Sequence, residues 1–244
     1  MSLIGVGLYT YGEASKLTNA SINDLNRWLK GYKYKNTHSQ KTTTISPLWE
    51  PELVDEDIQA ISFNDLLEIM FVIAFRKHGV SLQAIRIASQ HARELYNHTH
   101  PFTCKRFQTD GNSIFGEALK ETGEIELLNL VNYQFAMHQI IEQSLYKEIE
   151  FGNDDLARKW YPVARSKLIF LDPGIAFGKP IVSDGHVRTS ILYDSYKVEK
   201  NARIVSKIYE IPIKAVEAAI DFEEQPRGRP PTSRSCCGCA RRAG

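Results

Sequence analysis

Apolar residues recur at helical spacing in two short stretches near the N-terminus. The first, residues 11–17, places Ala14 and Leu17 on one helix face. An Asn-Ala-Ser break follows, and Ser21 is a good N-cap for a second helix over residues 22–30. Its expected buried stripe consists of Ile22, Leu25, Trp28 and Leu29. A short helix, a tight turn and a second helix are typical of a helix-turn-helix unit.

The opposite face of the second helix is polar, and a basic segment follows it. Asn and Arg are the side chains whose paired groups match adenine and guanine edges in the major groove. Residues 31–35 alternate Tyr and Lys before the polar, β-prone stretch 37–45, which predicts a strand followed by a wing-like loop. An amphipathic strand with solvated lysines is the simpler alternative. We predict a DNA interface in which Asn23, Asn26 and Arg27 reach base edges, Lys30, Lys33 and Lys35 contact phosphates, and Ser21 begins the reading helix.

Two further helices are predicted behind this unit. Residues 64–77 are apolar around most of the helix circumference, so this helix is expected to be a core helix or the seam of a homodimer. Gly79 ends it, and Ser81 caps the next helix, which runs to about Tyr96.

The hydrophobic period changes after residue 98. Residues 105–109 and 113–118 flank Asp110-Gly111, which predicts a β-hairpin because Asp-Gly suits a type I′ turn. A second strand pair is expected over 125–131 and 133–137, with a helix over 140–146. Short strands are expected around residues 169–172 and 179–187, followed by helices over 190–199, 201–209 and 213–222.

These elements predict an α+β fold that is mainly α. The expected parts are a winged helix-turn-helix domain over 1–97, a central β-hairpin section over 98–164, a small C-terminal helical domain with short strands over 165–224, and a disordered tail over 225–244.

Composition and charge narrow the class of protein. The chain of 244 residues is 43% hydrophobic and 24% charged, which is typical of a globular protein rather than of a disordered or collagenous one. No apolar run approaches the ~20 residues that span a bilayer, and residues 1–12 lack signal-peptide features, so we expect a cytoplasmic protein. Residues 1–44 net +4 and residues 225–244 net +5, whereas residues 45–224 net −8. A polyanion would therefore meet the basic N-terminal part.

Metal binding and catalysis are not indicated. Three of the four cysteines (Cys236, Cys237, Cys239) crowd the tail, without a second ligand pair at zinc-finger spacing, so we expect no metal and no cofactor. No nucleophile elbow or phosphate-binding loop marks an active site. An enzyme using the Asp-rich loops near residues 154 and 184 is the least favoured function.

Several segments resemble known families. Residues 9–18 (YTYGEASKLT), 28–34 (WLKGYKY) and 75–85 (FRKHGVSLQAI) resemble a MerR-like winged helix domain. Residues 177–182 (FGKPIV) and 211–223 (IPIKAVEAAIDFE) look like the small C-terminal domain of VapB-like antitoxins. Together with Leu171-Asp-Pro and residues 106–111 (RFQTDG), the order is similar to VapB-like antitoxins with an N-terminal DNA-binding domain. The usual Gly-Thr-Arg-Ile-Pro run of that family is here only residues 184–191 (DGHVRTSI).

The resemblance implies an antitoxin without enzymatic activity. Such a protein would bind operator DNA as an autorepressor and hold a PIN-like toxin ribonuclease inactive. We expect the toxin to contact the acidic body near its C-terminal end, with Tyr193, Tyr196 and Phe222 as anchors, unless these aromatics fill the core of their own domain. A homodimer is expected, because one reading unit covers only a few base pairs. The helix over 64–77 and the helix that follows it are the candidate seam, with the β section as the alternative. The alternative is a MerR-like transcriptional regulator that senses a small molecule.

Overall fold

The computed structural model describes residues 5–35, 42–53, 59–123 and 146–225. Its N-terminal part begins with α1 (Tyr11–Thr18), which a capping box between Thr10 and Glu13 starts. Asn19, in the left-handed conformation, ends this helix. Ser21 then caps α2 (Ile22–Lys30) by accepting a hydrogen bond from the amide of Asp24. The predicted helix-turn-helix unit is confirmed.

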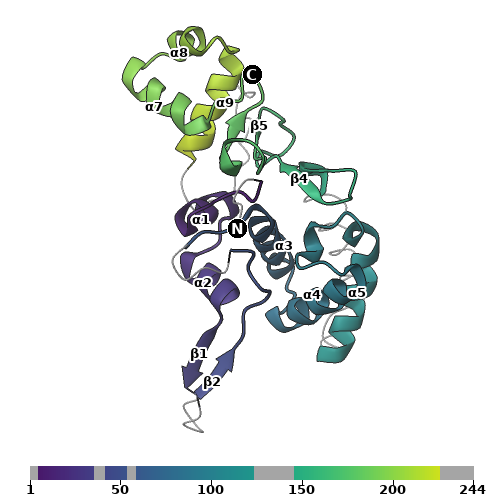
Figure 1. Cartoon of the computed structure of the whole chain (residues 1–244). Coiled ribbons are helices and arrows are strands. Elements are labelled where there is room, and N and C mark those ends of the chain that lie inside the picture. Colours follow the sequence, from purple (N-terminus) through teal and green to yellow (C-terminus); the bar gives the residue numbers. More distant parts are fainter. Residues whose placement is uncertain (1–4, 36–41, 54–58, 124–145, 226–244) are drawn as a thin grey trace, which may run out of the picture.

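A two-stranded antiparallel hairpin follows α2 and projects from the body of the molecule (Figure 1). Its strands are β1 (Tyr32–Lys35) and β2 (Thr42–Ile45), with Tyr32 opposite Ile45. Gly31 makes the join possible: its φ is +70°, and a Cβ at this position would lie 2.3 Å from the carbonyl oxygen of Ile45. The hairpin stands where the wing of a winged helix-turn-helix stands.

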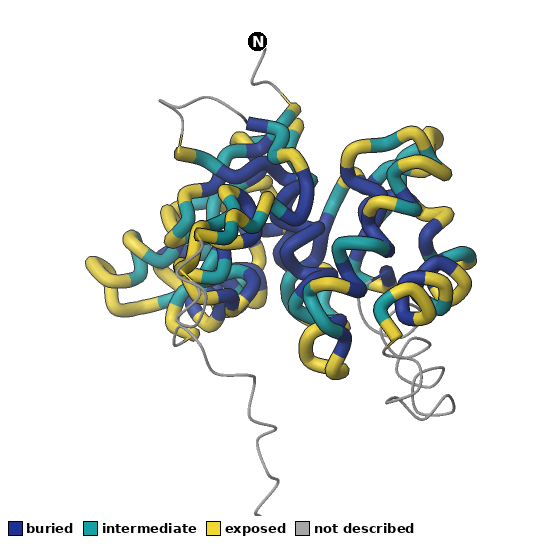
Figure 2. The backbone as a smooth tube through the Cα atoms, turned by 90° about the horizontal axis from the view of Figure 1, so that it is seen from below, coloured by how far each residue is buried: buried dark blue, intermediate teal, exposed yellow. Residues whose placement is uncertain are grey.

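Three long helices build the main core beside this unit. They are α3 (Phe63–Lys77), α4 (Leu82–Tyr96) and α5 (Phe107–Thr122). Helix α3 is buried along most of its length, which makes it the central core helix rather than a free dimer seam. Aromatic rings fill the space between the helices, namely Phe71, Phe75, Phe102, Phe107 and Phe115. Figure 2 shows these buried segments in dark blue along the middle of the molecule, with exposed segments at its margins.

The predicted hairpin over residues 105–118 is wrong, because this segment is helix α5. Its buried residues fall at helical spacing (Phe107, Gly111, Ile114, Phe115, Ala118, Leu119) and pack toward α4 and the aromatic core. Burial of this face outweighs the local turn preference of Asp110-Gly111. The second predicted strand pair and nearly all of the predicted helix over 140–146 lie outside the described residues.

Short elements connect the helical core to the C-terminal part. A 3₁₀ turn (η1, Pro101–Thr103) precedes α5. After residue 145 the chain forms η4 (Tyr146–Glu148) and then β3 (Ile149–Phe151), which pairs antiparallel with β4 (Ala157–Trp160). Next come β5 (Ile169–Phe170) and, after η5 (Ala176–Gly178), its antiparallel partner β6 (Ile181–Val182).

The C-terminal helices have their own core. They are α7 (Thr189–Glu199), α8 (Ala202–Tyr209) and α9 (Ile213–Glu224), close to the predicted bounds. One hydrophobic cluster runs from Tyr9 to Leu171, and a second gathers around Leu192, Val205 and Val216. Leu171 belongs to the first cluster, Val163 packs against the second, and a small third cluster joins Tyr161 to Phe170 and Ile181. A boundary at 164/165 thus does not fully separate the cores, and a boundary at 97/98 falls inside the first. Residues 1–97, 98–164 and 165–224 therefore remain a proposed division.

Helix α1 carries the contacts between the two parts. The ammonium of Lys16 lies 2.5 Å from the carboxylate of Glu223, and Leu17 packs against the C-terminal core. The hydroxyl of Tyr9, in the N-terminal part, donates a 2.6 Å hydrogen bond to the carbonyl of Gly178. The C-terminal domain is therefore docked on the helix-turn-helix unit.

Helices α8 and α9 repeat the local geometry of α1 and α2. Each pair starts with an eight-residue helix that a left-handed residue ends, Asn19 in one and Glu210 in the other. A buried residue follows each of these, Ala20 or Ile211, and its carbonyl accepts a serine hydroxyl from five residues earlier, at 2.7 Å and 2.6 Å respectively. Two turns among the described residues thus share this local geometry, 191 residues apart.

Candidate nucleic-acid interface

The outward face of α2 is the part of the first unit that is open to solvent. Leu25, Trp28 and Leu29 are buried against the core, which turns Asn23 and Arg27 outward. Lys30, at the end of the helix, is also exposed, and its ammonium lies 5.2 Å from the centre of the Tyr11 ring. Helix α2 thus presents an amide and two cations on its free side.

Arg27 connects this helix face to the hairpin. Its guanidinium lies 4.5 Å from the ring centre of Tyr32, close enough for a cation–π interaction. The Tyr34 ring is 6.2 Å from that of Tyr32 and partly exposed, so both tyrosines share one face of β1. Arg27, Tyr32 and Tyr34 therefore form one continuous surface from the helix to the hairpin.

Lys33 and Lys35 lie on the other face of the hairpin. Side chains alternate along a strand, so these lysines project opposite to Tyr32 and Tyr34, and both are exposed. The structure thus does not place all the predicted phosphate contacts on the surface that carries Arg27. Two faces of the hairpin are available to a duplex, one aromatic and one basic.

Two of the predicted DNA-binding residues use their polar groups within the helix. The hydroxyl of Ser21 accepts from the amide of Asp24 and donates to its carboxylate at 2.7 Å. The amide of Asn26 donates to the carbonyl of Ile22 at 2.9 Å. Asn26 thus keeps its second amide hydrogen and its carbonyl oxygen for a base, whereas Asn23 and Arg27 make no hydrogen bond of this kind among the described residues.

Ile22 contradicts the predicted buried stripe, because 49% of it is exposed. It is the first residue of α2 and extends beyond the core that covers Leu25 and Trp28. An exposed aliphatic residue at this position can contact a thymine methyl group in the major groove. Its place directly after the N-cap is the sequence signal that separates it from the interior stripe.

The helix that follows the second turn, α9, lacks the cationic face of α2. By position, Asn23, Asn26, Arg27 and Lys30 of α2 correspond to Lys214, Glu217, Ala218 and Asp221 of α9. The first set carries two cations and no acid, whereas the second set carries one cation and two acids. Because phosphate contacts dominate affinity for DNA, the charges at these four positions favour the first unit over the second as a face for a duplex.

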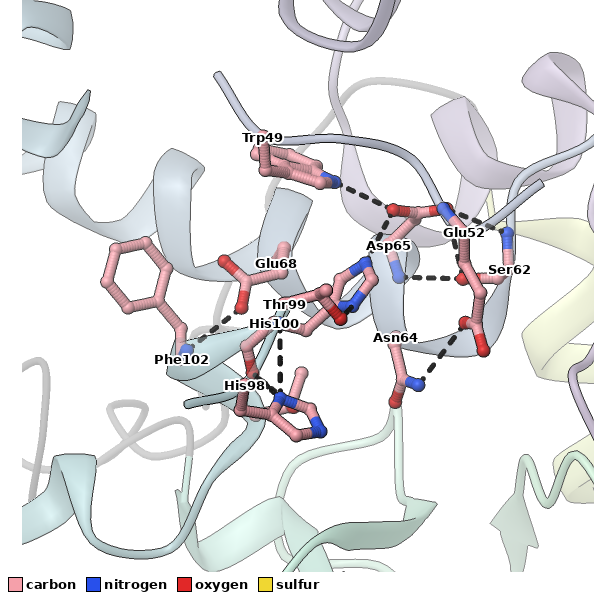
Figure 3. Close-up of polar contacts among 11 residues, drawn as sticks. Trp49, Glu52, Ser62, Asn64, Asp65, Glu68, His98, Thr99, His100 and Phe102 are labelled. Atoms are coloured by element: carbon pink, nitrogen blue, oxygen red, sulfur yellow. Dashed lines mark hydrogen bonds and ion pairs between the residues drawn. The ribbon is translucent and has the colours of Figure 1, made fainter. Parts of the chain in front are cut away.

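A buried polar cluster supports the start of α3 behind the interface (Figure 3). The carboxylate of Asp65 accepts from the indole of Trp49 at 2.7 Å, the imidazole of His100 at 2.9 Å and the hydroxyl of Ser62 at 3.0 Å. Burial would raise the pKa of Asp65, but the bonds from His100, Trp49 and Ser62 hold it below its ordinary value. Burial would likewise lower the pKa of His100, but Asp65 raises it. We interpret the cluster as structural.

Glu68 lies one turn further along α3 and is fully buried. One carboxylate oxygen accepts from the amide of Phe102 at 2.9 Å, and the other has no partner among the described residues. Burial raises the pKa of this carboxyl to about 8, although His100 and the Phe102 amide act in the opposite direction. Glu68 is therefore poised to bind a proton near neutral pH.

The three aromatics expected to anchor a toxin lie around the C-terminal core. Phe222 is buried there, and the ammonium of Lys16 lies 5.8 Å from its ring centre. Tyr193 and Tyr196 are half-buried against the same cluster. All three help to fill their own domain, and a role in binding a partner stays a prediction for each.

The structure also bears on metal binding and on membrane insertion. Among the residues that the structure describes, no three His, Cys, Asp or Glu side chains are placed to share a metal ion. No helix in the described ranges is both long and apolar enough to cross a membrane.

Comparison with known proteins defines the class of the N-terminal part. Residues 7–89 match a family described as "Putative DNA-binding HTH domain". The chain thus carries a helix-turn-helix domain of the DNA-binding class, as DNA-binding regulators do. The whole fold is similar to the crystal structure of Rv2018 from Mycobacterium tuberculosis, with a TM-score of 0.66 and 20% sequence identity over 89% of this chain and 99% of that chain. This likeness establishes the fold alone, and no curated protein matches the sequence.

Proposed function

We propose that the protein is the antitoxin of a type II toxin–antitoxin system, which represses its own operator and neutralises a PIN-like toxin ribonuclease. Its activity is binding, without catalysis, in the cytoplasm. The observation that carries the DNA-binding part is the continuous exposed surface of α2 and β1, on which Arg27 stacks against Tyr32. The antitoxin part rests on the VapB-like sequence segments.

The DNA assignment predicts different effects for a base contact and a phosphate contact. Arg27→Ala should cost about 1–3 kcal/mol and relax specificity at one base pair. Lys33→Ala should weaken binding to all sequences alike and lower the salt slope by about one. Lys120→Ala, an exposed lysine on α5, is the control. Fluorescence anisotropy with a duplex from upstream of the gene, over a salt series, measures both effects.

Full affinity in an Arg27→Ala/Lys33→Ala double variant would reject this interface. The wild-type chain must first discriminate the upstream duplex from a scrambled one of the same length. Without that discrimination, the protein is not an autorepressor at this site.

The C-terminal domain is the proposed toxin-binding part. Exposed aliphatic side chains on α7 and α8 give it apolar surface in addition to the three predicted aromatic anchors, namely Ile191, Val198, Ile204 and Ile208. Such exposed apolar groups are a feature of protein interaction sites. Residues 45–224 net −8, so attraction to the basic rim of a ribonuclease would speed encounter.

Two matched tyrosine variants test this division of roles. Tyr193→Ala should reduce capture of the neighbouring PIN-like protein and leave DNA affinity unchanged, whereas Tyr34→Ala on the hairpin should leave capture unchanged. Co-purification and suppression of ribonuclease activity are the measurements. Equal capture by both variants would remove Tyr193 from the proposed interface.

A homodimer remains part of the proposal, with one of the two predicted seam helices favoured. Because the chain itself covers α3, the exposed side of α4, where Leu95 is 63% exposed, is the better candidate. Sedimentation that shows a monomer at micromolar concentration, both free and on DNA, would refute dimerisation.

A MerR-like regulator that senses a small molecule is the second candidate function. A cavity beside α2 favours it, since its walls include the end of the reading helix. The absence of any PIN-like gene beside this one would favour this function over the antitoxin.

A further inference from the structure

A cavity of about 800 Å³ lies between the end of α2, the chain after the hairpin and α4. Leu29 and Lys30 of α2 form one wall, Leu48 and Leu53 a second, and Arg86 and Arg93 of α4 a third. Cavities that hold small molecules in proteins typically measure about 300–1,000 Å³. The size therefore suits a small organic ligand.

Among the described residues, the walls combine apolar surface with a small excess of positive charge. Arg86, Gln90 and Arg93 follow one another at i, i+4 and i+7 on α4, so they share one helix face. With Lys30, the described lining residues include three cations and two carboxylates. One of those carboxylates, Asp65, is already engaged by Trp49, His100 and Ser62.

Arg86 is held in place, whereas Arg93 is free to meet a ligand. The guanidinium of Arg86 donates to the backbone carbonyls of Pro47 and Ser46, the latter at 2.9 Å. Burial lowers the pKa of Arg86, and the nearby Arg93 cation lowers it further, although Tyr32 opposes this. The polar contact of Arg93 among the described residues is a long bond of 3.4 Å to the carbonyl of Ser89, on its own helix. The buried Glu68 carboxyl also attracts Arg93, whereas Arg86 has no carboxylate partner among the described residues, so the two cations share no carboxylate there.

We propose that this cavity binds a small organic anion, with its apolar body against Leu29, Leu48 and Leu53 and its carboxylate, sulfonate or phosphate group at Arg93 and Arg86. An apolar body alone would leave the partly desolvated cations unpaired, and a simple inorganic anion would leave the leucines uncovered. The two features together require an amphipathic ligand.

The position of the cavity connects it to DNA binding, a consequence that rests on the proposed function. Lys30 lines the cavity and is also a predicted phosphate contact. The amide of Leu48 donates to the carbonyl of Trp28 at 2.8 Å, which ties the second wall to α2. An anion bound at Arg93 and Arg86 would bring negative charge into the cavity that Lys30 lines, which opposes a phosphate at Lys30, so ligand and duplex should weaken each other by the same factor.

The direct test uses two fluorescent probes that differ in their charged group. 8-Anilinonaphthalene-1-sulfonate has an aromatic body and a sulfonate, and N-phenyl-1-naphthylamine has the same body without it. The full-length protein should bind the sulfonate probe at least tenfold more tightly, with about one probe per chain. Arg93→Gln should reduce that preference by about tenfold or more, since a charge-assisted hydrogen bond is lost. Arg203→Gln, the same change at an exposed arginine on α8, is the matched control.

A second variant guards against a folding artefact. Gln90→Trp keeps both arginines and places bulk at the cavity, so it should reduce the binding of both probes. Thermal melts must show that each variant unfolds as cooperatively as the wild type. Equal affinity for the two probes, an unchanged preference in Arg93→Gln, or equal losses in Arg203→Gln would overturn the proposal.

The effect of the ligand on DNA binding is tested independently of probe binding. At saturating sulfonate probe, the upstream duplex should bind more weakly to the wild type, and this effect should disappear in Arg93→Gln. If the probe binds as expected but duplex affinity does not change, the coupling is refuted and the anion site stands. If no duplex binds at all, the DNA function fails while the probe result still decides the site.

Discussion

Replacing Glu68 by Gln should change how the stability of the protein depends on pH. The carboxyl is fully buried, and one oxygen has no hydrogen-bond partner among the described residues. Its pKa is about 8 in the folded state, compared with 4.5 ordinarily. Because the folded-state pKa is the higher one, the folded protein binds more protons than the unfolded chain between these values. Stability should therefore fall as pH rises through this range.

The magnitude follows from the two pKa values. A difference of one pKa unit corresponds to about 1.4 kcal/mol, so a fully ionised Glu68 costs the folded state roughly 5 kcal/mol. The range from pH 5 to pH 8 covers most of this, and the loss over it should be about 3 kcal/mol. In Glu68→Gln the side-chain carbonyl can still accept from Phe102, but the amide group meets the unpartnered side. The variant should therefore be less stable at pH 5 by about 1–3 kcal/mol.

Urea unfolding at pH 5, 6, 7 and 8, followed by circular dichroism, measures the effect. Wild type and Glu68→Gln share the other titrating groups, so the difference between their unfolding free energies isolates Glu68. That difference should shift in favour of the variant as pH rises, and Glu117→Gln, an exposed glutamate on α5, should show no such trend. Parallel curves for wild type and Glu68→Gln would refute the assignment of a raised pKa to Glu68.

Three further changes test the packing around the interface. Gly31→Ala should destabilise the protein by about 1–3 kcal/mol through backbone strain, and further because its Cβ would meet β2. Gly79 has a φ of +86° and open space around it, so Gly79→Ala should show the strain only. Urea unfolding of the two variants compares these costs. Ser21→Ala removes the N-cap of α2 and should cost about 1 kcal/mol, whereas Ser21→Asp, which can accept the same bond, should restore most of that stability. An equal loss in both variants would argue against a capping role of the hydroxyl. Tyr9→Phe leaves the carbonyl of Gly178 without its donor and should lower stability by about 1–3 kcal/mol, so an unchanged melting temperature would contradict the importance of this contact between the two parts.

The sequence by itself determined the elements whose signals are local. The N-caps Ser21 and Ser81, and the long hydrophobic periods of α3 and α4, mark helix bounds within a residue or two. The helix-turn-helix unit follows from such signals, because its break and its buried stripe lie within twenty residues of one another. The exposed positions of Asn23 and Arg27 follow from the same periodicity.

Only the tertiary structure decided the features that depend on distant neighbours. Residues 107–122 carry a strong turn signal, yet the aromatic core that includes Phe75 and Phe102 makes them a helix. His100 meets Asp65 across 35 residues of chain, a pairing that no local spacing announces. The helical period alone does not specify where the core ends. That limit leaves Ile22 exposed and decides that the aromatic and basic faces of the hairpin are both open to solvent. The cavity likewise exists only because α4 packs beside α2, so its cations come from segments that are more than fifty residues apart in sequence.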